Sequence, residues 1–120
     1  MRRLARMSLS REEIEAARDL FSGLGEVTTR RMMGGLCLYH EGTIFAIVMA
    51  DGGVFLKGAG DFVAELEAAG CTQWSYRHKD RAQPTRMSYW TMPEEALDDP
   101  DRACDWARRA LAHLAPGGSP

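Results

Sequence analysis

Basic residues form the chemically most distinctive set in this sequence, because guanidinium and ammonium groups bind phosphates and carboxylates. We take the following as candidate interaction residues: Arg30, Arg31, Arg77, Lys79, Arg81 and Arg86. The last four flank the expected loop of a β-hairpin, where only Asp80 opposes them, and a basic arm occupies residues 2–6. This is the part of the chain that could contact nucleic acid. We favour a solvated loop and a loose arm over that interpretation.

Arg30 and Arg31 belong to the most distinctive string of the chain, Arg30-Arg31-Met32-Met33-Gly34-Gly35. Neighbouring residues of a strand face opposite sides of the sheet, so one of the two arginines should point toward the packed side. A guanidinium in that position needs a carboxylate or carbonyl partner. We therefore favour a structural ion pair over a binding site for this arginine.

Cysteine and histidine are the residue types that could supply a metal site or a nucleophile. They are Cys37, Cys71, Cys104, His40, His78 and His113. None of their spacings is typical of a zinc site or a redox dithiol. Cys37 and His40 stand three residues apart on a predicted strand, where their side chains face opposite ways, which disfavours a nucleophile–base pair. We predict no metal, no cofactor and no catalytic residue, with reduced thiols packed as small apolar groups.

Two further strings have a structural and a functional interpretation. The acidic run from Glu94 to Asp101 could act in acid–base chemistry, but it falls at two predicted helix starts, where negative charge is favourable. Gly58-Ala59-Gly60 precedes a helix, yet it lacks the remaining residues of a dinucleotide-binding or phosphate-binding loop. We favour the structural interpretation for both strings.

Hydrophobic periodicity and capping signals predict the elements that position these residues. Ser10 and Glu13 form a capping box ahead of the first helix, and Asp99-Pro100 marks the start of the last one. The predicted helices cover residues 11–22, 61–69 and 100–115, and the predicted strands cover residues 27–33, 36–40, 43–50, 54–57, 73–79 and 85–92. The order α-β4-α-β2-α, with short loops between strands, predicts an α+β fold in which helices pack against an antiparallel sheet of about five or six strands. The predicted core consists of Phe21, Leu38, Phe45, Ile47, Leu56, Phe62, Leu66, Tyr89 and Leu111.

Length and composition are typical of one small globular domain. The chain has 120 residues, with 15 Lys and Arg against 17 Asp and Glu. We expect a flexible arm over residues 1–9, a single domain over residues 10–115 and a disordered tail over residues 116–120. The longest apolar run, residues 44–50, is far shorter than the roughly 20 residues that cross a bilayer. We therefore expect a cytoplasmic protein that does not bind membranes, and the charge balance argues against strong autonomous nucleic-acid binding.

Several strings occur in the order and at the spacing of a known family. They are residues 30–39, Gly42, Phe45-Ala46, Phe55-Leu56-Lys57, Met87-Ser88-Tyr89-Trp90, residues 93–100 and Trp106-Ala107. Together they resemble the TfoX N-terminal family of competence regulators, with Met33 where the family often has an aromatic residue. The resemblance implies an α+β domain with an antiparallel sheet, no catalytic residues, and a link to competence genes through a partner transcription factor. Because the sequence ends just after this domain, we expect a stand-alone copy without the regulators' C-terminal domain.

Three functions follow from these observations. We favour a non-enzymatic protein-interaction module with a role in the regulation of transcription and competence. The first alternative is a weak nucleic-acid contact module that uses the basic hairpin of residues 77–86. The second is a small-ligand or enzymatic site that the motifs do not reveal. The sequence leaves open whether the chain forms a homodimer.

Overall fold

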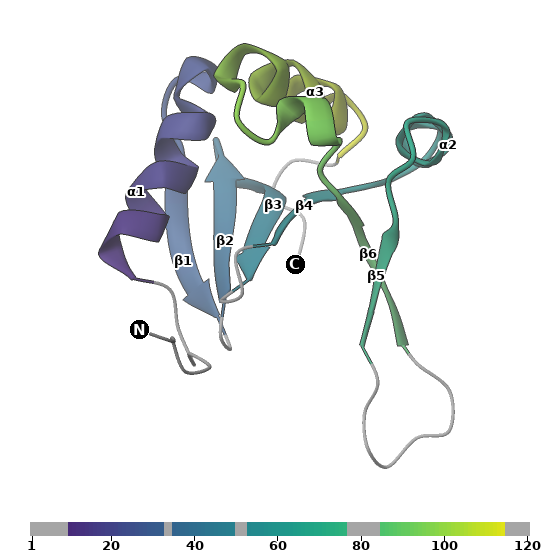
Figure 1. Ribbon diagram of the computed structural model, residues 1–120, viewed down its shortest axis with the longest axis horizontal. Coiled ribbons are helices and arrows are strands. Elements are labelled where there is room, and N and C mark those ends of the chain that lie inside the picture. Colours follow the sequence, from purple (N-terminus) through teal and green to yellow (C-terminus); the bar gives the residue numbers. More distant parts are fainter. Residues whose placement is uncertain (1–9, 33–34, 50–52, 77–84, 115–120) are drawn as a thin grey trace.

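In the described part of the chain, six strands form one antiparallel sheet, with helices packed against it (Figure 1). The computed structural model describes residues 10–32, 35–49, 53–76 and 85–114. Within them the helices are α1 (Arg11–Leu20), η1 (Ser22–Leu24), α2 (Phe62–Ala68), η2 (Glu94–Ala96) and α3 (Pro100–Ala112), where η denotes a 3-10 helix. The strands are β1 (Thr28–Met32), β2 (Gly35–His40), β3 (Thr43–Met49), β4 (Val54–Lys57), β5 (Gln73–Tyr76) and β6 (Thr85–Thr91). The sheet order is β1-β2-β3-β4-β6-β5, with antiparallel pairing throughout, which confirms the predicted α+β fold.

The starts of α1 and α3 follow the predicted capping chemistry, whereas Asp61 at the start of α2 makes no side-chain capping bond. The Ser10 hydroxyl accepts a hydrogen bond from the Glu13 backbone N–H at 3.2 Å, and a Glu13 carboxylate oxygen accepts one from the Ser10 N–H at 2.9 Å. Asp99 caps α3 by accepting hydrogen bonds from the two backbone N–H groups at 101 and 102. These bonds satisfy donors that a helix start leaves without intrahelical partners.

The helices end earlier than the sequence predicts. α1 stops at Leu20, because the chain tightens into the 3-10 turn η1 and the Ser22 hydroxyl donates to the carbonyl of Asp19. α3 stops at Ala112, because His113 leaves the helical conformation as its C-cap. Its predicted end, residue 115, lies outside the described residues, as do the arm of residues 1–9 and the tail of residues 116–120.

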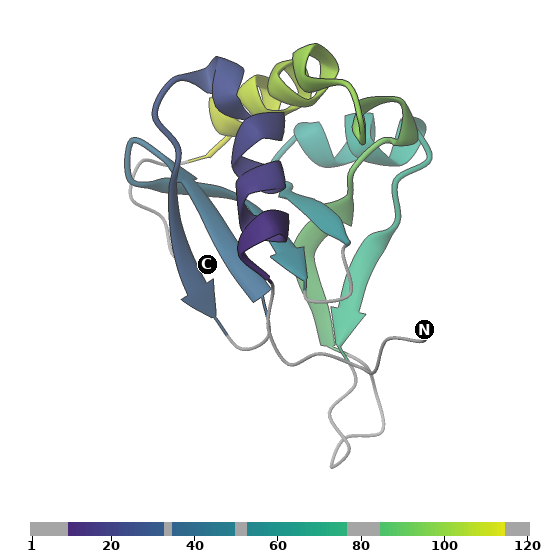
Figure 2. The ribbon, with the colours of Figure 1, turned by 60° about the vertical axis from the view of Figure 1, so that its left-hand side comes forward.

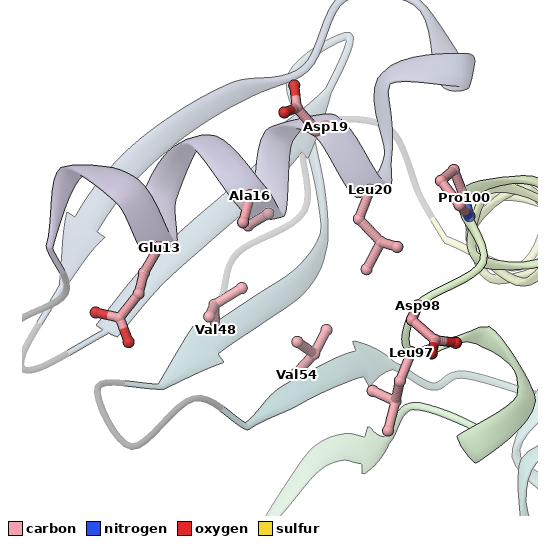
Figure 3. Close-up of a pocket in the computed structure, with 10 residues that line it drawn as sticks. Glu13, Ala16, Asp19, Leu20, Val48, Val54, Leu97, Asp98 and Pro100 are labelled. Carbon is pink, nitrogen blue, oxygen red and sulfur yellow. The ribbon is translucent and has the colours of Figure 1, made fainter.

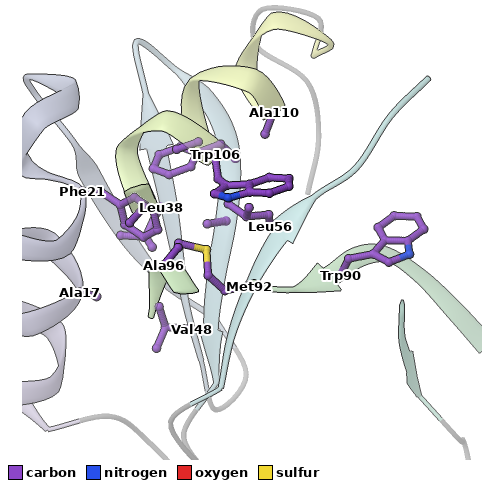
Figure 4. Close-up of a cluster of buried hydrophobic side chains, with 14 of the residues drawn as sticks. Ala17, Phe21, Leu38, Val48, Leu56, Trp90, Met92, Ala96, Trp106 and Ala110 are labelled. Carbon is purple, nitrogen blue, oxygen red and sulfur yellow. The ribbon is translucent and has the colours of Figure 1, made fainter. Parts of the chain in front are cut away.

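The main hydrophobic core lies on the helix-covered face of the sheet. In Figure 2, α1 crosses in front of the strands and α3 lies above them. All three α-helices contribute to this core, through Ala17 of α1, Phe62 and Leu66 of α2, and Trp106 of α3, among others. Figure 4 shows Trp106 and Ala110 of α3 above Leu38, Leu56 and Met92.

Eight of the nine predicted core residues are buried. They are Phe21, Leu38, Phe45, Ile47, Leu56, Phe62, Leu66 and Tyr89. Leu111 is the exception, since it is only half-buried against the core. The apolar stripe of α3 runs through Ala103, Trp106, Ala107 and Ala110, and Leu111 lies at its margin.

The other face of the sheet carries a smaller apolar cluster, because successive strand residues alternate between faces. Its buried members are Cys37, Ile44, Ile47 and Tyr89, and its partly buried members are Tyr39, Met49, Phe55, Trp74 and Met87. Among the described residues, no helix contributes to this cluster. The hydroxyl of Tyr89 is buried here and has no hydrogen-bond partner among the described residues. Burial, with added repulsion from Cys37 and Tyr39, raises the pKa of Tyr89.

The glycine string before α2 has a packing role. A Cβ atom on Gly58 would lie 2.7 Å from the indole ring of Trp90, which is closer than real Cβ atoms approach. The Gly58 N–H donates to the carbonyl of Ser88 at 3.0 Å, which holds the backbone against β6. Gly60 takes a positive φ of 56° in the turn that follows. Gly58 is therefore required where the chain leaves β4 close to the Trp90 side chain.

Candidate interaction groove

A groove of about 460 Å³ opens where α1 and the η2–α3 corner diverge above the sheet (Figure 3). We call it the α1–η2 groove. Its described lining residues are Glu13, Ala16, Ala17, Asp19, Leu20, Val48, Val54, Leu97, Asp98 and Pro100. They come from α1, β3, β4, the segment that joins η2 to α3, and the first residue of α3. The groove thus depends on elements far apart in the sequence.

The floor and one wall of the groove are apolar because small and β-branched residues face it. Val48 and Val54 are direct partners across the β3–β4 pairing and form the floor. Ala16 and Ala17 of α1 have short side chains, which leave space between this wall and the opposite wall of the groove. Leu20 closes the wall near the end of the helix.

The opposite wall is a short, well-anchored corner. The Glu95 carboxylate accepts a hydrogen bond from the Trp106 indole N–H at 3.2 Å and forms an ion pair with Arg102 at 2.7 Å. Arg102 also reaches Asp99 at 3.4 Å. Ala96 is fully buried in the core below. These contacts hold η2 against α3 and so determine where the following residues point.

Leu97 and Asp98 follow η2 and lie at the groove. Leu97 is 46% exposed, although it directly follows the buried Ala96. Its backbone N–H donates to the carbonyl of Glu94 at 3.2 Å, so its exposure is set by an ordered turn. Asp98 adds a carboxylate beside it (Figure 3).

The groove has charge of a single sign. Among its described lining residues, every charged side chain is a carboxylate, namely Glu13, Asp19 and Asp98. Within the described ranges, neither Asp19 nor Asp98 forms an ion pair. A second hollow, between η1 and α3, differs because Asp101 and Asp105 line it together with Arg102 and Arg108. The first groove therefore combines an apolar floor with a rim that favours cations.

The candidate basic residues are not brought together in the described structure. Arg77, Lys79 and Arg81 lie outside the described residues. Arg86 is exposed on β6, whereas Arg30 and Arg31 are exposed on β1, at the far edge of the sheet. Whether the six residues form an interaction surface stays a prediction.

The expectation that one arginine of the pair packs inward with an ion-pair partner is wrong. Arg30 lies opposite Cys37 and Arg31 opposite Leu36, so they do face opposite sides of the sheet. Both are exposed nonetheless, and neither has an ion pair among the described residues. The reason is that β1 is an edge strand, from which long side chains extend into water.

The cysteines and histidines described by the structure are used in packing. Burial raises the pKa of the Cys37 thiol, which disfavours the thiolate form of this side chain. His40 Nε2 lies 3.1 Å from the carbonyl oxygen of Leu24, and the His113 ring stacks on Phe62. In the part of the chain that the structure covers, no three His, Cys, Asp or Glu residues are grouped to hold a metal ion. Likewise, no helix of that part is long and apolar enough to cross a membrane.

Sequence reasoning did not identify the α1–η2 groove. Asp99 caps a helix start as predicted, whereas the structural interpretation does not hold for the whole acidic run. Three residues of that run, Leu97, Asp98 and Pro100, line the groove. The available signal was Leu97 itself, a large apolar residue among carboxylates.

Comparison with known proteins assigns the chain to a family. The sequence profile of the TfoX N-terminal domain matches residues 19–114. The chain is also 30% identical over 71 residues to the DNA transformation protein TfoX1 of Aliivibrio fischeri. That match covers 59% of this chain and 32% of the relative, so the chain spans only about a third of the relative's length. The chain belongs to the TfoX N-terminal domain family, as its sequence motifs indicate.

Proposed function

We propose that this domain is a non-enzymatic protein-interaction module that acts in the regulation of competence genes through a protein partner. Membership of the TfoX N-terminal domain family and a relative named for DNA transformation support the link to competence. Regulation through a partner transcription factor is what the resemblance to competence regulators implies. The proposed location of this activity is the cytoplasm.

The α1–η2 groove is the observation that carries the interaction part of this proposal. It exposes Leu97 from an ordered turn, above an apolar floor of Val48 and Val54. An exposed apolar surface with a polar rim is typical of a protein-binding site. Its carboxylates would repel nucleic-acid phosphates. A protein partner therefore suits the groove better than nucleic acid does.

The proposal is tested in the bacterium that carries the gene. The gene is deleted, and the deletion strain is complemented with the native chain or with an empty vector. We expect transcripts of the DNA-uptake genes to change with the native chain. We also expect the affinity-tagged chain to retain a protein partner after nuclease treatment. Transcripts that do not respond to the chain, or a partner lost on nuclease treatment, would refute the proposal.

A further inference from the structure

The acidic residues around η2 divide into two groups with different contacts. Glu95 and Asp99 are both paired with Arg102 at the surface. Asp98, between them in sequence, lines the α1–η2 groove, as does Asp19 from α1. Neither of these two has an ion-pair partner among the described residues. The fold thus uses the first pair and leaves the second pair available to a ligand.

The contacts that anchor η2 keep the apolar side chain of Leu97 exposed at the groove. The buried Ala96 and the Glu95 contacts to Arg102 and Trp106 anchor η2 on α3. Because η2 is a single tight turn, the residue after Ala96 is directed outward. Leu97 and Met32 are the two large apolar residues that the described structure exposes most, at 46% and 40%. Of the two, Leu97 lies beside a groove.

We propose that the α1–η2 groove binds a basic amphipathic helix of a partner protein. This proposal rests on the proposed function, because it names the chemistry of the partner. A helix that lies between two flanking elements places its apolar side chains at i, i+3, i+4 and i+7 into the groove. Lys or Arg residues beside those positions would meet Asp19 and Asp98 at the rim. The volume of about 460 Å³ is in the range of sites that hold a few large side chains.

Charge argues against two other occupants. A two-fold contact between copies of this chain through the groove would set the same carboxylates against each other. Like charges brought together in this way repel each other and disfavour the contact. Nucleic acid would bring phosphates to the same carboxylates and meet the same repulsion. A cationic apolar segment is the occupant whose chemistry matches both the floor and the rim.

The test uses a designed peptide of about five helical turns, with leucines on one face and lysines beside them. Its binding to the full chain is measured by fluorescence anisotropy and mapped by NMR chemical shifts. We expect the lysine peptide to bind and to shift the signals of Leu97, Asp98 and α1. A peptide with glutamates in place of the lysines should bind at least about tenfold more weakly, and affinity for the lysine peptide should fall with added salt.

Substitutions with matched controls locate the site. Leu97→Ser should weaken binding by about tenfold, and Asp98→Asn by about threefold. The control Met32→Ser removes the other exposed apolar side chain, and Glu94→Gln removes an exposed carboxylate that does not line the groove. Both controls should change the affinity by less than about twofold. Circular dichroism of each variant establishes that it is folded.

Several outcomes would overturn the proposal. They are no binding of the lysine peptide, equal binding of the glutamate peptide, NMR shifts confined to other surfaces, or a dimer in sedimentation that Leu97→Ser dissociates. Failure of this inference is distinguishable from failure of the proposed function. If Leu97→Ser restores transcripts as well as the native chain does, the groove proposal fails and the regulatory role stands. If the native chain has no effect on transcripts, the regulatory role fails, and the peptide experiment still reports on the groove.

Discussion

The two faces of the sheet bury apolar side chains in different ways. On the helix-covered face, buried tryptophans have partners for their polar atoms: the Trp90 indole N–H lies 3.4 Å from Glu67, and that of Trp106 lies 3.2 Å from Glu95. On the other face, the Tyr89 hydroxyl is buried without one. A satisfied polar group makes a core specific, whereas an unpaired one reduces stability. From this comparison we expect substitutions on the helix-covered face to lower stability more than substitutions on the other face.

The largest expected effect is at the centre of the helix-covered face. Leu66 of α2 is fully buried in the main core. Leu66→Ala should lower the free energy of unfolding by about 2–5 kcal/mol, because it removes apolar contacts and leaves a cavity. Urea denaturation measures the change. Leu97→Ala, which truncates an exposed leucine, is the control and should stay within about 0.5 kcal/mol. Equal losses in the two variants would show that the helix-covered face does not dominate stability.

A smaller loss is expected where backbone and ring meet at Gly58. The added Cβ of Gly58→Ala would lie 2.7 Å from the Trp90 ring, so the ring or the strand must move. Overpacking of this kind costs about 1–3 kcal/mol. In a Trp90→Leu background the same substitution should cost less, because the ring that it meets is gone. Thermal denaturation of the four proteins gives this coupling, and additive losses would contradict the proposed clash.

The residues with local signals are the ones that sequence reasoning places correctly. The Ser10–Glu13 capping box, the Asp99 cap and the strand Val54–Lys57 all depend on neighbours within a few positions. The exposure of Arg30 and Arg31 depends instead on β1 lying at a sheet edge, and alternation alone carries no such information. The groove requires α1 and η2, which are far apart in the chain, to diverge above β3 and β4. Pairing across such distances has no signature in a single sequence.

The polar contacts at the rim of the helix-covered face should contribute about as much as ordinary hydrogen bonds. Glu95→Ala removes the acceptor of the Trp106 indole N–H and the ion-pair partner of Arg102. Because Glu95 and Arg102 are both about half exposed, water replaces part of the lost interaction, and we expect a loss of about 1 kcal/mol. Glu94→Ala, at the neighbouring exposed carboxylate, should lose less than about 0.5 kcal/mol. Chemical denaturation of both variants shows whether the loss of stability comes from the contacts that Glu95 makes or from the removal of a negative charge alone.

The smallest expected effect, with the opposite sign, is at Tyr89. Since its buried hydroxyl has no partner, Tyr89→Phe removes a polar group that costs desolvation energy. At pH 7 we expect no loss of stability, or a gain of up to about 1 kcal/mol.

The pKa of Tyr89 is raised in the folded state, mainly by burial, so folding disfavours the ionised phenol. The contribution of the neutral phenol is therefore fully present below the unfolded pKa of about 10 and is lost as the pH rises above it. The native chain should lose stability relative to Tyr89→Phe between about pH 10 and pH 11.5, a window above that unfolded pKa. Urea denaturation of both proteins at pH 7 and in this range measures the difference. A loss of more than about 1 kcal/mol for Tyr89→Phe at pH 7 would instead mean that the hydroxyl is satisfied, and the two faces of the sheet would then be alike.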